Sequence, residues 1–233
     1  YDVVVHVAGI AHIKETQKNE EIYYRVNRDL AYEVAQKAKI DGANQFIFLS
    51  SMSVYGVRNG VITKKTPLNP TTNYGKSKLQ AEKLIENLED QTFKVAILRP
   101  PMIYGKGCKG NYVRLTNFAK KTPIVPYIEN KRSMIYIENL CQCIKYLIDN
   151  NSRGLFFPQN ESYVSTSRMV ELIAIANGRK IFFTKVFNPL IYFLMRYEFF
   201  NKVFGDLVYE KNMSSIEEFE QVPFPESIKR TEM

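Results

Sequence analysis

Strand-like and helix-like patterns alternate along the first hundred residues, and this alternation constrains the fold more than any other feature. Residues 2–7, 45–49 and 93–98 are short apolar runs, typical of strands buried on both faces of a parallel sheet. Between them, residues 27–40 and 74–88 repeat apolar side chains at helical spacing. The order strand–helix–strand–helix–strand predicts an α/β fold with helices on both sides of a parallel sheet.

The organisation changes near residue 104, where the elements become shorter. Residues 134–137 are typical of a strand and residues 139–148 of a helix. A further helix is predicted from Ser165 or Thr166 as its cap to residue 177, with Gly178 at its end. The chain opens directly on the first strand, at Tyr1 rather than Met, and we expect residues upstream of it.

Charge and composition exclude several classes of protein. The chain has 32 Lys and Arg against 24 Asp and Glu, and its net charge of +8 favours anionic partners without choosing among them. Three cysteines and two histidines give neither a disulfide framework nor a metal site, which suits a reducing cytoplasm. No motif for binding nucleic acid is present.

No apolar stretch reaches the roughly 20 residues that a membrane span requires. The nearest, residues 187–200, is interrupted by Arg196 and Glu198. We predict that it is a buried or dimer-facing helix.

A glycine motif at residues 105–110 matches G-x-G-x-x-G, the pattern of dinucleotide-binding turns. That turn requires its first glycine directly after a strand, whereas two prolines lie within residues 100–104, between the predicted strand and Gly105. We therefore interpret the segment as a substrate loop, whose amides, Lys106 and Lys109 can face an anion.

A Tyr–x–x–x–Lys motif at Tyr74 and Lys78 places a phenol and an ammonium on one face of a predicted helix. A nearby cation is expected to lower the tyrosine pKa, so that the phenol can accept a proton from a hydroxyl group. A second match, Tyr127 and Lys131, follows a proline in a loop-like stretch and is rejected.

Two serines follow the predicted strand at residues 45–49. Ser50 and Ser51 occupy its carboxyl end, which is where ligands bind in parallel α/β sheets. We predict that Ser51, Tyr74 and Lys78 form one catalytic group.

Several segments together resemble one protein family, the NAD-dependent sugar-nucleotide epimerase/dehydratase family of extended short-chain dehydrogenases/reductases. UDP-glucose 4-epimerase is its best-known member. The resemblance runs from end to end of the chain, in the family's order. The matching segments are residues 5–9, 23–27, 46–56, 74–78, 98–105, 132–140 and 225–228.

The resemblance implies a role for each matching residue. Tyr74 is the catalytic acid/base, Lys78 holds the nicotinamide ribose and tunes Tyr74, and Ser51 bonds the sugar oxygen that is oxidised. The cofactor would also be lined by Ala8, Gly9, Asn27 and Ser50. The UDP-sugar would be bound by Ser53, Asn111 and Arg132, with Arg132 on a phosphate.

The family also implies the domain organisation. Residues 1–103 would be the C-terminal part of a doubly wound Rossmann domain that lacks its Gly-rich first βαβ unit. Residues 104–233 would be a smaller mixed α/β substrate domain, with some elements returning to the sheet. By the same resemblance, the cofactor would be NAD, with NADP left open, and the assembly would be a homodimer. The strand at residues 2–7 would be left as a bare apolar edge, and most contacts to adenosine would be missing. We therefore expect this chain alone to fold poorly and to bind NAD weakly.

Three functions remain open at this point. The first is 4-epimerisation of UDP-glucose or UDP-N-acetylglucosamine in the synthesis of surface polysaccharides. The second is NAD(P)H-dependent reduction of a 4-keto sugar nucleotide, and the third is a non-catalytic domain of the same fold. Met52 and Ser53 stand where sugar dehydratases place Asp-Glu, which argues against dehydration. Met102 stands where many 4-epimerases have Asn, which leaves the sugar open.

Overall fold

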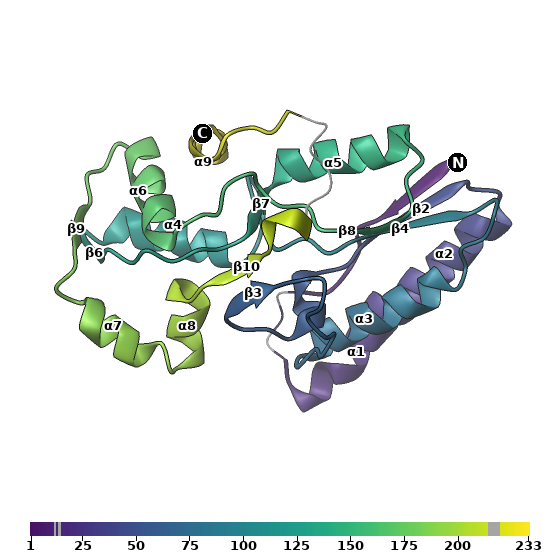
Figure 1. The fold of residues 1–233 in the computed structure, drawn as a ribbon, viewed down its shortest axis with the longest axis horizontal. Helices are drawn as coiled ribbons and strands as arrows, with labels where there is room; N and C mark the ends of the chain where they lie inside the picture. The colour runs from purple at the N-terminus through teal and green to yellow at the C-terminus, as the bar shows by residue number, and fades with distance from the viewer. Residues whose placement is uncertain (12, 14, 214–219) are drawn as a thin grey trace.

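A four-stranded parallel sheet forms the centre of the larger lobe (Figure 1). The computed structural model describes the chain except for residues 12, 14 and 214–219. The strand order within the described residues is β1-β2-β4-β8. The strands are β1 (Val3–His6), β2 (Gln45–Leu49), β4 (Lys94–Leu98) and β8 (Gly154–Phe156).

Helices cover both faces of this sheet (Figure 1). On one face, α2 (Leu30–Ile40) and α3 (Asn73–Glu86) pack against Phe46 and Phe48 of β2. On the other face, α5 (Ile137–Asp149) packs against Ile47. Successive residues of a strand point to opposite faces, so a continuous apolar run is what a sheet covered on both sides requires.

The chain reaches α2 through an irregular helical segment. It contains a short 3₁₀ turn (Gln17–Asn19), α1 (Glu20–Tyr24) and a π-helical turn (Arg25–Asp29) that continues into α2. A π turn adds one residue to a helical turn, and such turns are frequent at functional sites. Here the turn holds Asn27, which is fully buried.

A second lobe is built on two small parallel ladders (Figure 1, left). In the first, β5 (Met102–Tyr104) pairs with β7 (Met134–Tyr136), and in the second, β6 (Ile124–Pro126) pairs with β9 (Phe182–Thr184). Its helices are α4 (Asn111–Lys121), α6 (Thr166–Ala176), α7 (Asn188–Leu194), α8 (Glu198–Phe204) and α9 (Phe224–Glu232).

A third ladder connects the two lobes. In it, β3 (Gly60–Ile62) pairs in parallel with β10 (Leu207–Tyr209). The Tyr209 hydroxyl donates to the carbonyl of Arg99, 2.8 Å away, just after β4. β10 therefore joins the end of the central sheet to the second lobe.

Most predicted elements are confirmed by the structure. The α/β fold with a parallel sheet is present, and β2 covers the same residues as the predicted strand. The predicted cap of α6 is also confirmed, since Ser165 Oγ accepts from the amide of Arg168 at 3.1 Å. No helix among the described residues is long and apolar enough to cross a membrane.

Two expectations for the second half of the chain are wrong. The sequence predicts a proline-containing loop before Gly105, but β5 runs directly into this glycine. The strand forms because residues 102–104 pair with β7 in a small ladder outside the main sheet. Residues 187–200 do not form one buried helix, and a dimer-facing position for them stays a prediction. The extended backbone of Tyr197 separates α7 from α8, and no residue of α7 is buried.

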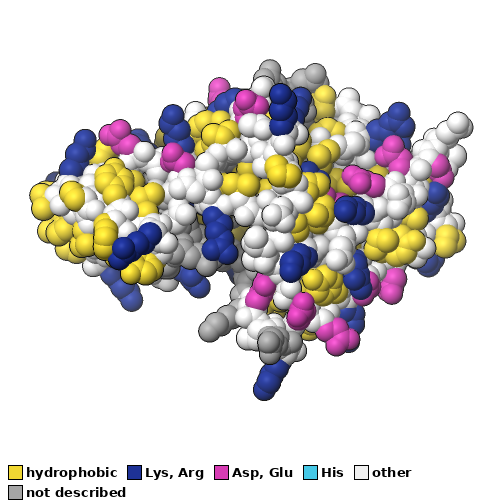
Figure 2. All heavy atoms as spheres, turned by 60° about the horizontal axis from the view of Figure 1, so that its bottom comes forward, with side chains coloured by type: hydrophobic (Ala, Val, Ile, Leu, Met, Phe, Trp, Pro, Cys, Tyr) yellow, Lys and Arg dark blue, Asp and Glu magenta, His cyan; other side chains and the backbone are white. Residues whose placement is uncertain are grey.

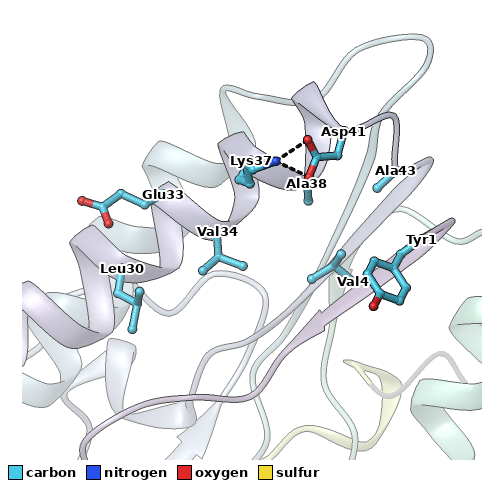
Figure 3. A pocket seen from close by; sticks show the side chains of 9 residues that line it. All are labelled: Tyr1, Val4, Leu30, Glu33, Val34, Lys37, Ala38, Asp41 and Ala43. Atoms are coloured by element: carbon cyan, nitrogen blue, oxygen red, sulfur yellow. Dashed lines mark hydrogen bonds and ion pairs between the residues drawn. The ribbon is translucent and has the colours of Figure 1, made fainter.

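A cavity of about 310 Å³ lies between α2 and the edge strand β1 (Figure 3). Its walls are mostly apolar, with Val4 of β1 facing Leu30 and Val34 of α2. Lys37 at its rim is ion-paired with Asp41 of the same helix, which neutralises both charges. Because none of the predicted catalytic residues lines this cavity, it is separate from the candidate site.

Candidate active site

The structure brings Ser51 and Tyr74 together although they lie 23 residues apart in the sequence. Ser51 directly follows β2 and caps a 3₁₀ turn (Met52–Tyr55), where its Oγ accepts from the amide of Ser53 at 3.1 Å. Tyr74 lies in the first turn of α3, and the Ser51 hydroxyl is close enough to its phenol to act on the phenol's pKa. The two hydroxyl groups thus meet at the carboxyl end of the sheet.

The start of α3 is fixed by two side chains. Thr72 Oγ1 accepts from the amide of Gly75 at 3.1 Å. The Glu15 carboxylate accepts from the amides of Asn73 and Tyr74 at 2.9 and 3.1 Å. A carboxylate is favourable at a helix N-terminus because the free amides there carry partial positive charge. Glu15 was not predicted as a site residue, and its distance in sequence leaves no local signal for it.

The glycine after the tyrosine allows the close approach between α3 and the 3₁₀ turn. A Cβ at Gly75 would lie 2.6 Å from the carbonyl oxygen of Ser53, closer than any real side chain comes. Any larger residue at position 75 would therefore push Tyr74 away from Ser51.

Lys78 lies one turn further along α3 and is almost completely buried. Its Nζ donates to the carbonyl oxygen of Leu49 at 2.8 Å and lies 4.6 Å from the centre of the Phe48 ring. Burial lowers the pKa of Lys78 to about 8, although the charge of Glu82 opposes this shift. The ammonium is thus held beside Leu49, the last residue of β2.

The pKa of Tyr74 shifts in the direction opposite to the sequence-based expectation. Burial raises the pKa of the Tyr74 phenol, and the hydrogen bond from Ser51 only partly offsets it. The expectation that Lys78 lowers the pKa of Tyr74 is wrong. The Lys78 ammonium is directed at the Leu49 carbonyl, and the penalty for a buried phenolate outweighs the hydrogen bond from Ser51.

The loop after β1 reaches the same centre. Asn27 Oδ1 accepts from the amide of Ile10 at 2.7 Å, and its Nδ2 donates to the Ile10 carbonyl at 3.0 Å and to Ser77 Oγ at 3.1 Å. These bonds hold the exposed Ala8 and Gly9 beside α3. A Cβ at Gly9 would lie 3.2 Å from Lys78 Nζ, so the backbone of Gly9 borders the ammonium directly.

Two buried polar atoms at this end of the sheet lack a hydrogen-bond partner among the described residues. They are Ser50 Oγ, directly after β2, and His6 Nε2, at the end of β1. Burial, with the Lys78 charge in second place, lowers the pKa of His6, so its imidazole is neutral at pH 7. Buried polar atoms are nearly always paired, and unpaired ones next to Lys78 and Gly9 are what a ligand site provides.

The unpaired hydroxyl leads to a prediction for Ser50→Ala. Because Ser50 Oγ is buried without a partner, we expect this change to leave the free energy of unfolding equal or to raise it by about 1 kcal/mol. Ser77 is the matched control, since its Oγ accepts from Asn27 and donates to the carbonyl of Tyr74. Ser77→Ala is expected to lower the free energy by about 1 kcal/mol. Urea unfolding measures both, and equal losses would contradict the assignment.

The low pKa of Lys78 predicts a dependence of stability on pH. The unfolded chain holds a proton on this lysine up to its ordinary pKa of 10.5, and the folded chain only up to about 8. Below pH 8 the lysine is charged in both states, and burial of this charge lowers the free energy of unfolding by a constant amount. As the pH rises towards 10.5, the folded chain releases its proton first and this loss of stability becomes smaller. We therefore expect the stability of the wild type, relative to Lys78→Met, to rise across this range. Urea unfolding at several pH values checks it, with the exposed neighbour Lys76→Met as control; a constant difference would contradict it.

The residues predicted to bind the sugar nucleotide are distributed over both lobes. Ser53 is exposed beside the catalytic centre, where its Oγ lies 3.2 Å from Ser51 Oγ. Arg132 lies in the second lobe, donates from Nη1 to the carbonyl of Gly205 at 2.9 Å, and lines a cavity of about 420 Å³. Asn111 is the first residue of α4, but its side chain lies outside the described residues.

The glycine motif at residues 105–110 connects β5 to α4. A Cβ at Gly105 would lie 2.2 Å from Ile137 Cγ2, so the first glycine is required for packing against α5. Lys106 and Lys109 are exposed. Because the motif belongs to the second lobe rather than to the four-stranded sheet, its interpretation as a substrate loop remains a prediction.

A buried ion pair holds α3 against the end of β4, and the sequence analysis missed it. Arg99 Nε and Nη2 donate to the Glu82 carboxylate at 3.0 and 2.7 Å, and Nη1 donates to the Tyr55 hydroxyl at 2.9 Å. Both charged side chains are almost fully buried. A charged residue at the end of a predicted buried strand was the available signal.

A protein family and two curated proteins are similar to this chain in sequence. The model of the NAD dependent epimerase/dehydratase family matches residues 1–163. A UDP-glucose 4-epimerase of Vibrio cholerae is 34% identical over 216 residues, covering 87% of this chain and 63% of the relative. An N-acetyl-alpha-D-glucosaminyl-diphospho-ditrans,octacis-undecaprenol 4-epimerase of Escherichia coli O157:H7 is 31% identical over 159 residues, covering 66% of this chain and 47% of the relative.

Solved structures share the fold at low sequence identity. The UDP-glucuronic acid 4-epimerase of Bacillus cereus, in complex with NAD, has a TM-score of 0.75 at 17% identity and covers 99% of this chain and 73% of its own. The dTDP-4-dehydrorhamnose reductase of Bacillus anthracis, in complex with NADP, has a TM-score of 0.73 at 20% identity, with 99% and 79% covered. These neighbours are Rossmann-fold epimerases and reductases. The chain itself spans 63% and 47% of the length of the two curated relatives above.

Proposed function

The chain belongs to the NAD-dependent epimerase/dehydratase family, and from this premise we propose that it takes part in the 4-epimerisation of a sugar nucleotide, UDP-glucose or UDP-N-acetylglucosamine. The observation that carries the proposal is the position of Ser51 and Tyr74 at the carboxyl end of the parallel sheet, with Lys78 one helical turn further along α3. This arrangement suits removal of a proton from a hydroxyl group that is being oxidised.

The residues at the end of β1 and β2 fit the nicotinamide end of a dinucleotide. Ser50 supplies an unpaired hydroxyl, Gly9 leaves its backbone open beside Lys78, and the Lys78 ammonium can donate to ribose hydroxyls. NAD, when bound, supplies a hydride acceptor and a positive charge that favours the Tyr74 phenolate. NADP remains an alternative, because the sequence gives no residue that reads the 2′ position of the adenosine ribose.

Each catalytic side chain then has one task in the proposed reaction. Ser51 donates a hydrogen bond to the oxygen on C4 of the sugar, and Tyr74 Oη accepts the proton of that hydroxyl as the carbonyl forms. Tyr74 returns the same proton when the hydroxyl is restored on the opposite face. Lys78 keeps α3 in place through its hydrogen bond to Leu49, and its ammonium is available to the ribose of the cofactor.

Arg132 is the proposed partner of the diphosphate. A guanidinium binds phosphate oxygens through paired hydrogen bonds, and Arg132 is positioned at the cavity by Gly205. Ser53 and Asn111 are proposed to contact the sugar nucleotide.

The substrate unit would comprise residues 104–233, and the partial dinucleotide unit would comprise residues 1–103. We also propose a homodimer located in the cytoplasm, where polysaccharide precursors are made.

A second carrier of the sugar, a polyprenyl diphosphate, is supported by the walls of the Arg132 cavity. Apolar side chains of α7 and α8 form much of its lining, namely Ile191, Phe200, Val203 and Phe204. Such walls suit a prenyl chain better than a nucleoside. The relative from Escherichia coli O157:H7 bears the name of an epimerase for a lipid-linked sugar of this kind.

Product analysis distinguishes the candidate functions. The protein encoded by the complete gene is incubated without reductant with UDP-glucose, UDP-N-acetylglucosamine or polyprenyl diphosphate N-acetylglucosamine, and the sugars are separated by chromatography. Conversion to the C4 epimer, with cofactor in trace amounts, supports an epimerase and identifies its carrier. Oxidation of NAD(P)H with a 4-keto-6-deoxy sugar nucleotide, without any epimer, would replace the proposal by the reductase.

A further inference from the structure

Helix α7 is apolar on all sides, and yet none of its residues is buried. Apart from the first residue, Asn188, its sequence is Pro-Leu-Ile-Tyr-Phe-Leu. A helix that is apolar all round is normally enclosed by protein or by lipid. Five apolar side chains in and beside this helix, which we call the α7 patch, are 48–56% exposed. They are Phe187, Leu190, Tyr192, Phe193 and Tyr197.

The two sides of α7 have different surroundings. Ile191 on the inner side lines the Arg132 cavity together with Phe200 and Phe204. Leu190 and Phe193 on the outer side follow each other at i, i+3 and form one continuous stripe. Helix α7 lies at the periphery of the second lobe, away from the central sheet (Figure 1). The α7 patch is therefore an outer surface of the lobe that carries the Arg132 cavity.

Cations border the α7 patch closely. The guanidinium carbon of Arg196 lies 3.7 Å from the centre of the Phe193 ring and 5.0 Å from that of Tyr197. Lys185 precedes the patch in sequence, and its exposed ammonium lies 3.9 Å from the Glu129 carboxylate. A guanidinium over an aromatic face is attracted by the electrons of the ring, so Arg196 holds its positive charge directly at the patch.

The basic charge of the whole chain is concentrated in this lobe. Residues 105–135 and 178–204 contain 12 of the 32 Lys and Arg but only two of the 24 Asp and Glu. The first segment includes α4 and β6, and the second includes β9, α7 and α8. Figure 2 shows apolar side chains gathered on this lobe with Lys and Arg around them, and few acidic groups. The lobe that carries the apolar patch thus has an excess of cations, with Arg196 at the patch itself and Lys120 paired with Glu232.

We propose that the α7 patch docks this protein on the surface of an anionic phospholipid bilayer. Phe193, Leu190 and the tyrosine rings would enter the headgroup region, and Arg196 and Lys185 would meet lipid phosphates. Aromatic rings and Arg side chains are the groups that favour the boundary between water and acyl chains. A second copy of the chain is a less suitable partner. A two-fold contact through the patch would bring Arg196 and the neighbouring cations of one copy close to the same cations of the other.

Docking of this kind would orient the second lobe towards the lipid. Ile191 belongs to the helix that carries the patch, and it also lines the Arg132 cavity. Only this helix would therefore separate the cavity from the lipid headgroups. The inference does not depend on which sugar carrier is used, and its test does not involve turnover.

Tryptophan fluorescence provides a sharp test, since the chain has no tryptophan. Phe193→Trp places a single reporter in the patch, and Ile40→Trp places one at the end of α2, where Ile40 is 80% exposed. Each variant is titrated with vesicles of phosphatidylcholine containing 30% phosphatidylglycerol, and with pure phosphatidylcholine. We expect a blue shift of the reporter at position 193 with the anionic vesicles only, and no shift of the reporter at position 40.

Flotation of the same vesicles measures how much the patch contributes. The double change Leu190→Ser and Phe193→Ser is expected to reduce the bound fraction at least tenfold. Arg196→Glu is expected to reduce it about fivefold or more, with a weaker dependence on salt. Val61→Ser is the control, since Val61 is 56% exposed on β3, outside the lobe. Unchanged thermal melting of each variant ensures that only the surface has changed.

Three results would overturn the proposal. Vesicle binding without a shift at position 193 would mean that charge elsewhere holds the protein to the lipid. A shift that follows protein concentration in the absence of vesicles would identify a second copy of the chain as the occupant. Equal binding of the Leu190→Ser and Phe193→Ser double variant and the wild type would exclude the patch itself.

Discussion

Replacing Tyr74 by phenylalanine is expected to lower turnover of the sugar nucleotide by about 10²–10⁴-fold, the usual contribution of a general acid/base. The ring stays in place, while the hydroxyl group that meets Ser51 and would carry the proton is lost. We expect the circular dichroism spectrum to be unchanged and the stability to be lowered by no more than about 1 kcal/mol, because one hydrogen bond is removed. Steady-state kinetics of the protein encoded by the complete gene measure the effect.

The second Tyr–x–x–x–Lys motif offers a matched control. Tyr127 and Lys131 lie in the irregular segment after β6, and neither belongs to a helix. Tyr127→Phe removes the same hydroxyl group and is expected to leave turnover within about twofold. Similar losses in the two variants, or full activity of Tyr74→Phe, would remove Tyr74 from the proposed role.

Breaking the buried ion pair is expected to have the largest effect on stability. Glu82→Gln leaves the Arg99 guanidinium charged and buried with neutral partners, which typically costs about 3–5 kcal/mol. Burial alone would lower the pKa of Arg99, but its hydrogen bonds to Glu82 and the Glu82 charge outweigh burial and raise it. The variant loses this support, but an arginine side chain keeps its proton in proteins, so Arg99 cannot escape the penalty by deprotonation. Urea unfolding of the variant and the wild type measures the loss.

An exposed ion pair on α6 is the control for this experiment. Arg168 and Glu171 are paired at i, i+3, with side chains 51% and 39% exposed. Glu171→Gln is expected to change the free energy of unfolding by less than about 0.5 kcal/mol, because water screens such pairs. A loss for Glu82→Gln as small as that for Glu171→Gln would mean that the Arg99 pair does not hold α3 in place.

Three of the four strands of the central sheet were predictable because their physical cause is local, whereas β8 was not predicted. A strand enclosed on both faces must be apolar throughout, and the run at residues 45–49 could form nothing else between two helical patterns. The proximity of Ser51 and Tyr74 was predictable for a related reason, since ligand-binding residues in such folds gather at the carboxyl ends of the strands, where Ser51 follows β2 and Tyr74 begins a helix. Both inferences depend on periodicity and chain direction alone.

Features that depend on distant contacts were not predictable. Glu15 caps α3 from 58 residues away, and the partner of Arg99 is chosen by the packing of α3 on β4. The direction of the Tyr74 pKa shift was wrong because helical spacing does not reveal that the Lys78 ammonium points at a backbone carbonyl. The break between α7 and α8 falls at Met195–Arg196–Tyr197, where neither glycine nor proline marks it.

The fate of the hydrogen on C4 of the sugar is the most direct test of the central claim. UDP-glucose and UDP-N-acetylglucosamine carrying deuterium at C4 are incubated with the protein encoded by the complete gene, and the products are analysed by mass spectrometry and NMR. We predict that the C4 epimer forms with its deuterium retained at C4 and with no hydrogen from solvent at that carbon. Replacement of the C4 deuterium by solvent hydrogen, or exchange at C5 in its place, would contradict a catalytic centre built on Ser51, Tyr74 and Lys78 that oxidises and restores C4.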